Sequence, residues 1–236
     1  MKLYADLHIH SCLSPCGDEL MTPNNIVNMA LLKGLDIIAV SDHNTCGNLS
    51  AVCSVAAQNG LTVIPAMEME TMEEVHTLAY FATLEDALSF SDEIYTYLPS
   101  VANNPDFFGR QLYMNDDDEI VAQEPKLLLS ALSITVEEGF EIVKKHNGIA
   151  VPAHIDRPSH GMIPILGFIN PHLGVTCVEV SPIGIAQGFA QYDPRLLTIT
   201  NSDAHDLGSI LEPIHQIELE QNTPEAFLKM LRRGKG

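Results

Sequence analysis

The stretch Asp6-Leu7-His8-Ile9-His10 lies close to the start of the chain and has the apolar–polar alternation of a strand. Side chains alternate between the two faces of a strand, so His8 and His10 are expected to project to the same side. Two imidazoles on one face can share a metal ion, and Leu7 and Ile9 are expected to pack on the opposite face. The pair alone is only a weak indication of a metal site.

More histidines and acidic residues recur where other apolar runs end. These sets are Ser41-Asp42-His43-Asn44, Met67-Glu68, Val75-His76, Ala153-His154-Ile155-Asp156 and Ser202-Asp203-Ala204-His205. Together with His8 and His10 they hold six of the ten histidines, a distribution that scattered surface histidines would not follow. In parallel barrels functional groups collect at the C-terminal ends of the strands. The sequence therefore predicts one site built from strand ends.

The alternation of strands and helices predicts an α/β fold with a parallel sheet or barrel. Strands are expected at residues 3–9, 36–40, 61–66, 75–81, 149–153, 175–180, 197–200 and 214–219. Helices are expected at residues 49–58, 84–98 and 135–145, and after Thr22-Pro23 and Thr223-Pro224, where threonine caps the helix and proline takes its first position. Thr135 and Glu138 form a predicted capping box.

The link between Glu68 and the next apolar run is too short for a parallel connection. Only residues 69–74 separate Glu68 from the run at 75–81, whereas a parallel crossover needs a dozen or more residues. We therefore expect the strand at 75–81 to return antiparallel. This arrangement would bring His76 to the end of the sheet where Glu68 lies.

The length and composition predict one large domain with a full core. The chain has 236 residues and 46% hydrophobic residues. The first residues enter an apolar strand directly after Met1-Lys2, and no apolar run approaches the length needed to span a membrane. We therefore expect a cytoplasmic protein without a membrane partner. Five cysteines, an odd number, are expected to be reduced thiols.

The charge balance bears on the choice of partner. The formal net charge is −19, from 12 basic and 31 acidic residues. Such a charge repels polyanions and leaves few side chains to neutralise phosphates, so long nucleic acid is not expected as a main partner. Bound divalent ions would reverse the sign of the potential inside a cleft. A small phosphorylated substrate is therefore compatible with the acidic chain.

Residues 84–133 break the alternation of strands and helices. The segment contains no histidine and includes the acidic turn Asn115-Asp116-Asp117-Asp118-Glu119. We interpret it as an insertion that acts as a lid or a substrate-selecting element. A solvated helical excursion without a function is the alternative.

The order of these motifs resembles that of the PHP (polymerase and histidinol phosphatase) superfamily. The resemblance rests on Asp6-Leu7-His8-Ile9-His10-Ser11, Ser41-Asp42-His43-Asn44, Met67-Glu68, Val75-His76, Ala153-His154 and Ser202-Asp203-Ala204-His205. It covers nearly the whole chain outside the insertion. It implies a single domain over residues 1–236, a distorted (β/α)7 barrel, and a di- or trinuclear metal centre that hydrolyses phosphoesters.

The resemblance also implies which residues hold the ions. One ion is assigned to His8, His10, Glu68 and Asp203, a second to Glu68, His76 and His154, and a third to Asp18, His43 and His205. Glu19 is the alternative to Asp18, because the Ser-Asp-Gly often found in the family is replaced by Ser14-Pro15-Cys16-Gly17-Asp18-Glu19. Imidazole and carboxylate donors suit Mn²⁺, Zn²⁺ or Fe²⁺, so two or three such ions are the expected cofactors.

Four further residues are candidates for roles around the ions. Arg157 and His160 follow closely after His154, and a guanidinium can bind phosphate through two hydrogen bonds. Arg157 is thus a candidate phosphate anchor, with a surface salt bridge as the alternative. Asp6 and Asp42 precede predicted ligands and could orient their imidazoles, although carboxylates at such positions also serve turns and helix caps.

The remaining histidines and two cysteines are expected to be structural. His146, His172 and His215 lie beside no carboxylate cluster. Cys12 and Cys16 flank the predicted centre but lack a second cysteine pair, so we interpret them as small buried or loop thiols rather than as ligands.

The predicted function is metal-dependent hydrolysis of a small phosphorylated metabolite or nucleotide, a phosphatase or phosphodiesterase reaction in which the ions activate hydroxide. Exonuclease-like trimming of short oligonucleotides is an alternative within the same chemistry. An amidohydrolase-type enzyme is less well supported, because many such enzymes use a carboxylated lysine at a strand end and none of the lysines here has that position. A non-catalytic metal-binding regulatory module is the third alternative.

Overall fold

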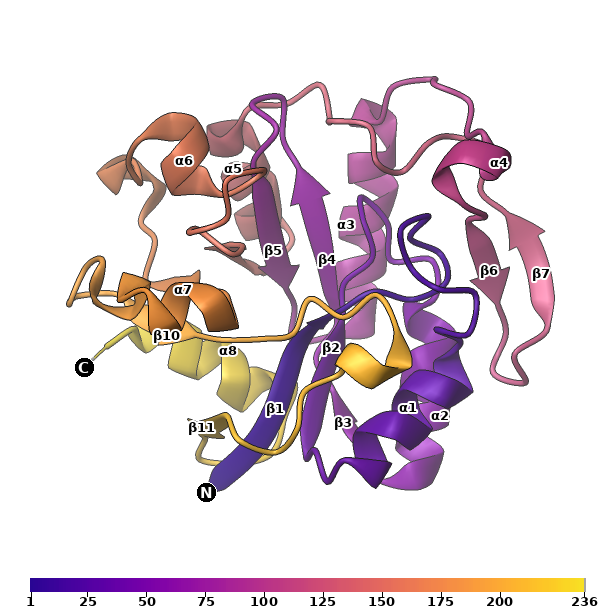
Figure 1. The fold of residues 1–236 in the computed structure, drawn as a ribbon, viewed down its shortest axis with the longest axis horizontal. Coiled ribbons are helices and arrows are strands. Elements are labelled where there is room, and N and C mark those ends of the chain that lie inside the picture. The colour runs from indigo at the N-terminus through magenta and orange to yellow at the C-terminus, as the bar shows by residue number, and fades with distance from the viewer. Residues whose placement is uncertain (236) are drawn as a thin grey trace.

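Strand β1 (Lys2–Ile9) lies at the centre of the fold, between one parallel and one antiparallel neighbour (Figure 1). The computed structural model describes residues 1–235. In it β1 pairs in parallel with β2 (Ile37–Val40) and antiparallel with β11 (Gln216–Glu218). Strand β2 continues the sheet in parallel to β3 (Thr62–Val63). Every residue of β2 is buried, as expected for a continuous apolar run covered on both faces.

A second sheet has the order β4-β5-β8, with bounds Ala66–Glu70, His76–Tyr80 and Ile149–Pro152. Strand β5 is antiparallel to both neighbours. The predicted antiparallel return is thus confirmed, and His76 pairs with Glu70. The short link between β4 and β5 therefore brings the imidazole to the end of β4.

The strand predicted at 61–66 is divided into β3 and β4. Pro65 lies at the break, and a proline has no N–H with which to continue a ladder. After the break, β4 pairs regularly with β5 in a separate sheet and keeps only the single-residue bridge His43↔Glu68 to the first sheet among residues 1–235.

The sheets do not join into one continuous ladder. Strand β9 (Cys177–Glu179) pairs in parallel with β10 (Leu197–Ile199), and β6 (Leu112–Met114) forms a separate hairpin with β7 (Ile120–Gln123). Single-residue bridges connect the sheets at His43↔Glu68 and Ile9↔Ala204. The predicted α/β class is confirmed, whereas a closed barrel is not found within residues 1–235.

The helices surround the strands (Figure 1). The longer ones are α1 (Pro23–Leu32), α2 (Leu49–Asn59), α3 (Leu84–Tyr97), α5 (Val136–Lys145) and α8 (Pro224–Arg233). The short ones are α4 (Pro105–Phe108), α6 (Met162–Leu166), α7 (Pro182–Ala186) and the 3₁₀ turns η1 (Pro171–Leu173), η2 (Phe189–Gln191) and η3 (Leu207–Ser209). Thr22, Thr135 and Thr223 cap α1, α5 and α8, and the capping box of Thr135 with Glu138 is confirmed.

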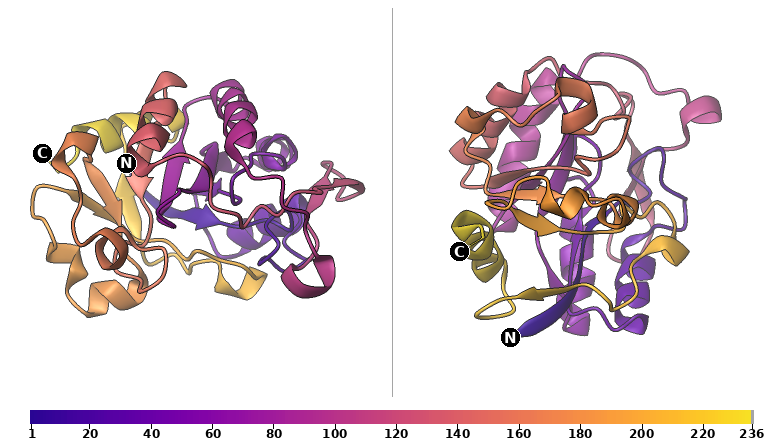
Figure 2. Two further views of the ribbon diagram at one scale, coloured as in Figure 1. Left: turned by 90° about the horizontal axis from the view of Figure 1, so that it is seen from above. Right: turned by 60° about the vertical axis from the view of Figure 1, so that its left-hand side comes forward.

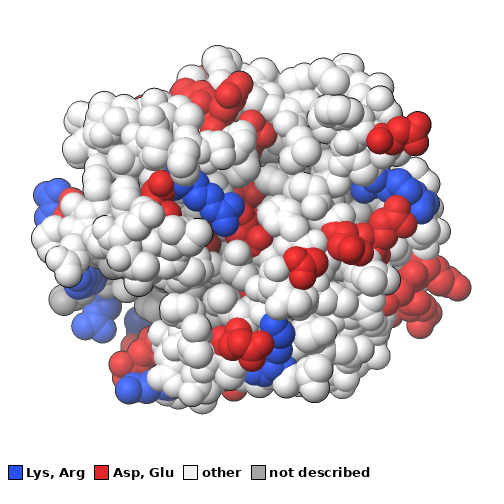
Figure 3. Space-filling view, in the orientation of Figure 1, with Lys and Arg blue, Asp and Glu red and all other residues white. Residues whose placement is uncertain are grey.

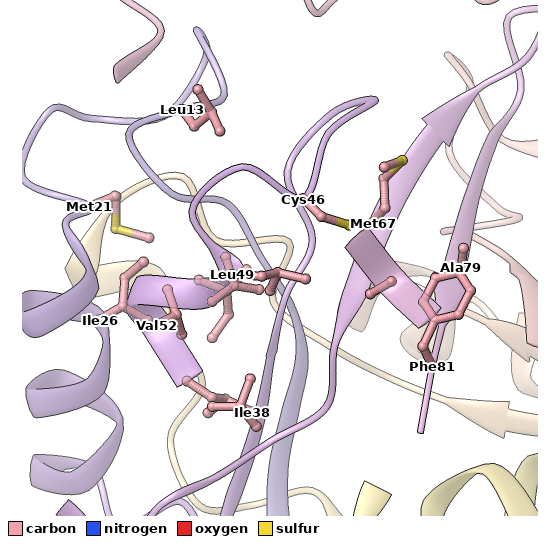
Figure 4. Packing of buried hydrophobic residues seen from close by; sticks show 14 of the residues in the cluster. Leu13, Met21, Ile26, Ile38, Cys46, Leu49, Val52, Met67, Ala79 and Phe81 are labelled. Carbon is pink, nitrogen blue, oxygen red and sulfur yellow. The ribbon is translucent and has the colours of Figure 1, made fainter. Parts of the chain in front are cut away.

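The two largest hydrophobic clusters fill much of the space between strands and helices. In one of them Ile26 of α1, Val52 of α2 and Met67 of β4 lie among the buried side chains shown in Figure 4. The other packs β1 and β5 against Phe227 of α8. Leu7 and Ile9 are both buried but belong to different clusters, because the pairing of β1 with β2 shifts register between Asp6 and Ile9. The expectation that they share one face is therefore wrong.

The segment of residues 84–133 has an inner and an outer part. Its first helix, α3, buries Ala87, Phe90 and Ile94 against the core. The hairpin of β6 and β7 lies at one edge of the molecule, as the view from above in Figure 2 shows. The hairpin thus stands away from the main sheets, whereas Leu128 and Leu132, at the end of the segment, are buried in the first cluster.

Two observations concern the thiols and the helices. All five cysteines are free, as expected from their odd number. None of the helices within residues 1–235 combines the length and the hydropathy needed to cross a bilayer.

Replacement of Phe227 tests the packing of α8 on the sheets. Phe227 is fully buried, and its ring meets that of Tyr80 edge to face with centroids 5.2 Å apart. Phe227→Ala should lower the free energy of unfolding by about 3–5 kcal/mol, measured by urea denaturation, because it leaves a cavity. Phe107→Ala is the control, since Phe107 is 77% exposed and its loss should cost within about 0.5 kcal/mol. Equal losses in the two variants would contradict this account of the core.

Candidate metal centre

The strand ends bring four predicted ligands to one point. The Nε2 atoms of His8 and His10 lie 3.2 Å apart. Asp203 Oδ1 lies 3.2 Å from the first and 3.0 Å from the second. Glu68 Oε1 lies 3.3 Å from His8 Nε2. Three separate regions of the chain therefore supply donors that face one small volume.

Glu68 connects this group to further imidazoles. Its Oε1 atom lies 2.9 Å from His76 Nδ1 and 3.2 Å from His154 Nε2. Its Oε2 atom lies 3.1 Å from His43 Nδ1. The two oxygens thus face different imidazoles, and the side chain is 1% exposed. A carboxylate in this position is suited to bridge two ions.

A third group of ligand atoms contains a residue that the sequence did not indicate. One atom each of His10, Cys16, His43 and His205 lies within 4.8 Å of the others. Cys16 was expected to be a buried or loop thiol, because it flanks the predicted centre without a second cysteine pair. A fourth group, of Glu70, His76 and His160, adds Glu70, which shares a strand face with Glu68 two residues earlier.

The structure does not bring Asp18 into the centre. Asp18 is exposed, and its Oδ1 accepts a hydrogen bond from the N–H of Leu20 at 2.8 Å. The carboxylate therefore closes a turn at the surface. Glu19, the alternative, is also exposed and pairs with Arg110 at 3.2 Å.

The side chains in the centre fit a cation better than they fit one another. His43 Nδ1, His76 Nε2, His154 Nδ1 and Asp203 Oδ1 are buried atoms without a hydrogen-bond partner among residues 1–235. Several of them lie close to an opposite charge, but without the geometry of a hydrogen bond. Lone pairs that converge in this way suit a divalent ion. The imidazole and carboxylate donors fit Zn²⁺, Mn²⁺ or Fe²⁺.

Hydrogen bonds on the far side of the rings turn the lone pairs inward. Ser14 Oγ donates its one proton to Asp42 Oδ1 at 2.7 Å, so it must accept from His10 Nδ1, 3.0 Å away. This leaves the lone pair of His10 Nε2 facing the centre. His8 Nδ1 lies 3.1 Å from both oxygens of Glu179 and has the same orientation.

Glu179, at the end of β9, was not among the predicted site residues but has a central role. Besides His8, it accepts hydrogen bonds from the N–H of His154 at 2.8 Å and from Asn201 Nδ2 at 2.6 Å. Burial alone would raise the pKa of Glu179, but the charge of His8 and its hydrogen bonds lower it. One buried carboxylate therefore connects β9 with β1 and with the loops after β8 and β10.

The two predicted orienting aspartates differ. Asp42 acts on His10 through Ser14 and also accepts from the N–H and Oγ of Ser11. Asp6 accepts from the N–H and Oγ of Ser202 and from the N–H of Leu211. The expectation that Asp6 orients an imidazole is therefore wrong, because its carboxylate holds the loop after β10 instead.

Several residues of the centre have positive φ angles, which non-glycine residues adopt at a cost. These are Asn44 (53°), His154 (25°), His160 (61°) and Asp203 (53°). Asn44 stabilises its own turn, since its Nδ2 donates to the carbonyls of Leu128 and Ser130. Such strain clusters at functional sites.

A cavity of about 260 Å³ opens over the centre. Arg157, Ser159, His160, Cys16 and Leu129 line it, together with residues of the ligand groups. Figure 3 shows acidic atoms inside the hollow at the middle of this face, with a basic side chain at its edge.

Arg157 and His160 both lie at this cavity, as their place in the sequence predicted. Arg157 forms an ion pair with Asp203 Oδ2, and its side chain is 38% exposed. The ring of His160 stacks on that of His76 with centroids 4.2 Å apart.

In this centre, burial and the neighbouring charges shift the pKa values in opposite directions. Burial alone would lower the pKa of His10, but the nearby carboxylates of Asp203 and Glu68 raise it to about 9. In the same way, Glu68 and Glu70 outweigh burial and raise the pKa of His76 to about 9. For Glu68, burial is outweighed by the charges of the surrounding imidazoles, which hold its pKa well below the usual range.

The chain matches the family described as the PHP domain over residues 6–232. It belongs to the PHP domain family. The 3',5'-nucleoside bisphosphate phosphatase of Chromobacterium violaceum is 29% identical over 73 residues, and the 5'-3' exoribonuclease Rnm of Salmonella typhimurium is 32% identical over 75 residues. Each match covers 31% of this chain and 25% of the relative. The PHP relatives are therefore hydrolases of phosphoesters, and this chain spans about a quarter of the length of each.

A solved structure has the same fold as the PHP chain. The lesion-specific endonuclease Q of Pyrococcus furiosus superposes with a TM-score of 0.72 at 21% identity. The similarity covers 100% of this chain and 57% of that one. The α/β fold with several sheets is thus that of PHP structures.

A second structure of endonuclease Q contradicts the prediction that long nucleic acid is not a partner. It is a complex with a 27-mer duplex substrate with an abasic lesion at the active site, and it superposes with a TM-score of 0.69 at 21% identity. The similarity covers 58% of that chain, so a larger protein that contains this fold can act on a duplex. Net charge was a poor guide, because screening limits the reach of exposed charges to about 8–10 Å in physiological salt.

The pKa values predict that metal binding releases protons. His10 and His76, with pKa values near 9, hold protons at neutral pH, and a divalent ion must displace them. The affinity for Zn²⁺ or Mn²⁺ should therefore rise from neutral pH toward pH 9. Calorimetric titrations in buffers of different ionisation enthalpy would measure the protons released. An affinity that does not change over this range would contradict the assignment of both imidazoles.

Proposed function

We propose that this chain hydrolyses phosphoesters with two or three divalent ions held in the centre. The observation that carries the proposal is the convergence of His8, His10, Glu68 and Asp203 beside a cavity lined by Arg157. In this proposal the first ion is held by His8, His10, Glu68 and Asp203, the second by Glu68, His76 and His154, and the third by His43 and His205 with one further donor. Mn²⁺, Zn²⁺ and Fe²⁺ all suit such donors.

The chemistry divides between the ions and the protein. When bound, such ions supply a water of lowered pKa and stabilise the charge on the attacking and leaving oxygens. Glu179 and Ser14 hold protons on the outer nitrogens of His8 and His10, which keeps the inner nitrogens free to bind. The cavity presents the reacting phosphorus to this group.

Arg157 is the proposed anchor of the substrate phosphate. It is the basic residue that lines the cavity, and its guanidinium already contacts one oxygen of Asp203. A guanidinium forms strong paired hydrogen bonds with phosphate oxygens. In this proposal Arg157 therefore orients the substrate beside the ions, and His160, stacked on His76, borders the same space.

The cavity supports a substrate that inserts one phosphorylated unit. Its volume of about 260 Å³ lies near the lower limit of small-molecule sites, roughly 300–1,000 Å³. A small phosphorylated metabolite or nucleotide would fit. The second candidate is nucleic acid, favoured by the endonuclease Q complex and by the exoribonuclease relative. Such a substrate would enter the cavity with the end of a nucleic-acid strand or with one nucleotide extruded from a duplex.

We also propose that the sheets form a distorted (β/α)7 barrel within a single domain. Contacts support the missing joins: Glu68 N–H donates to Asp42 O, Ile155 N–H to Glu179 O, and Ala204 N–H to His8 O. They connect β2 with β4, β8 with β9, and β10 with β1.

The insertion of residues 84–133 is proposed as a substrate-selecting element. Leu129, near its end, lines the cavity, and the neighbouring carbonyls of Leu128 and Ser130 are held by Asn44. The segment therefore contributes one wall beside the ligands.

Metal loading tests the proposed reaction. The protein loaded with Mn²⁺ would be assayed on nucleotides, sugar phosphates, short oligonucleotides and a duplex with an abasic site. His8→Ala and Asp203→Ala should lose bound metal, measured by elemental analysis, and activity together. His172→Ala is the control, since His172 is exposed and belongs to none of the ligand groups. Full loading without cleavage of any phosphoester would refute the proposal and favour a non-catalytic metal-binding module.

Arg157→Gln tests the phosphate anchor. The loss of charged hydrogen bonds worth about 1.5–3 kcal/mol should lower kcat/KM by about tenfold to a hundredfold. Metal content should stay unchanged. Arg195→Gln is the matched control, because Arg195 is exposed and pairs with Asp193. A normal kcat/KM in Arg157→Gln would show that another group holds the phosphate.

A further inference from the structure

The loop that follows β1 carries a thiol into the metal centre. The Sγ atom of Cys16 lies within 4.8 Å of ring nitrogens of His10, His43 and His205. His10 already faces the first group, through Asp203 Oδ1 at 3.0 Å. His43 Nδ1 likewise faces Glu68 Oε2 at 3.1 Å. Cys16, His205 and a ring nitrogen of His43 nevertheless lie close enough together to hold a separate ion.

We propose that Cys16, as a thiolate, is a ligand of the third ion together with His43 and His205. This inference rests on the function proposed above and names the donor that Asp18 does not supply. The carboxylate of Asp18 is occupied in a surface turn with Leu20. The thiol, by contrast, lines the cavity over the centre.

The backbone holds the Cys16 loop against its partner ligand. The N–H of Asp18 donates to the carbonyl of His205 at 2.8 Å, and the N–H of Gly17 donates to Ser14 O at 2.9 Å. A Cβ atom at Gly17 would lie 2.6 Å from Ser11 O, so this close turn requires glycine. The loop therefore presents Cys16 beside His205 without a rearrangement.

The inserted segment supports the same loop from outside. Gly109 lies against Pro15, and a Cβ atom there would be 2.2 Å from the Pro15 carbonyl. The N–H of Leu112 donates to Cys12 O at 3.0 Å. Both sides of the loop are thus in contact with ordered backbone.

The buried ring of His43 lies at the border of this group. Its side chain is 95% buried, and its Nδ1 faces Glu68 Oε2 at 3.1 Å without a hydrogen-bond partner among residues 1–235. The ring lies between two ligand groups, one with Cys16 and His205 and one with Glu68 and His76. A buried imidazole with an unused nitrogen is costly unless an ion satisfies it.

A thiolate donor changes which ion this position prefers. Sulfur is a soft ligand that favours Zn²⁺, Co²⁺ or Fe²⁺ over Mn²⁺, and two imidazoles with one thiolate leave a position for a further ligand. Binding releases the thiol proton of Cys16 to solvent. The third position is therefore expected to discriminate against Mn²⁺ more strongly than the first.

Cobalt substitution tests the ligand directly. Co²⁺-loaded wild-type protein should show a sulfur-to-cobalt charge-transfer band in the near ultraviolet. Cys16→Ser should lose the band and one bound ion per chain. Cys53→Ser is the matched control, since Cys53 lies on α2 and in none of the ligand groups of the described chain; it should keep both. A fully loaded wild type without the band, or a band that survives in Cys16→Ser, would overturn the inference.

A second variant separates this inference from the proposed function. His205→Ala keeps the thiol but removes a partner ligand, so the band should also be lost or strongly weakened; an unchanged band would place the sulfur on another ion and overturn the inference. Phosphoesterase activity in a loaded protein that lacks the band would refute the thiolate ligand alone. Failure of the His8 and Asp203 group to bind any metal would refute both.

Discussion

The buried carboxylate of Glu68 is the constraint on which the arrangement of the strands depends. A carboxylate that is 1% exposed is costly unless opposite charges or hydrogen bonds surround it. Here the compensation comes from His8, His43, His76 and His154, which reach it from the ends of four other parts of the chain. None of these contacts is local except that with His76. The buried charge of Glu68 is therefore stabilised only when the strands converge and bring these imidazoles to it.

This requirement explains why the ladders break where they do. His43 and Glu68 form the single bridge between the first two sheets, and Ala204 forms another with Ile9. His43 and Glu68 are themselves predicted ligands, and Ala204 lies between the predicted ligands Asp203 and His205. Asp203 and Asn44 have positive φ angles, which turn the chain out of the strand direction. A regular barrel ladder at these places would point the side chains elsewhere, so regular pairing is lost where the ligands are needed.

Most of the ligand groups could be predicted from the sequence because each ligand ends a strand whose apolar pattern is local. The same holds for the return of β5, which follows from a short link, and for the caps of α1, α5 and α8. Cys16 could not be found in this way. Its loop has no periodicity, and its shape depends on Gly109 and His205, which are distant in sequence. Glu179 was not among the predicted site residues either, since its three partners come from other elements.

The prediction that excluded long nucleic acid was wrong because the net charge of the whole chain does not describe the electrostatic potential at the cavity. The charge of −19 sums groups over the whole chain, and exposed charges are screened beyond about one Debye length, roughly 8–10 Å. A substrate that reaches the cavity meets instead a few groups: Glu68 and Asp203 among imidazoles, with Arg157 at the side. The carboxylates there concentrate the negative charge that divalent ions neutralise. In the proposed reaction the acidity of the centre therefore serves to bind cations, and through them phosphate, and does not exclude a polyanion.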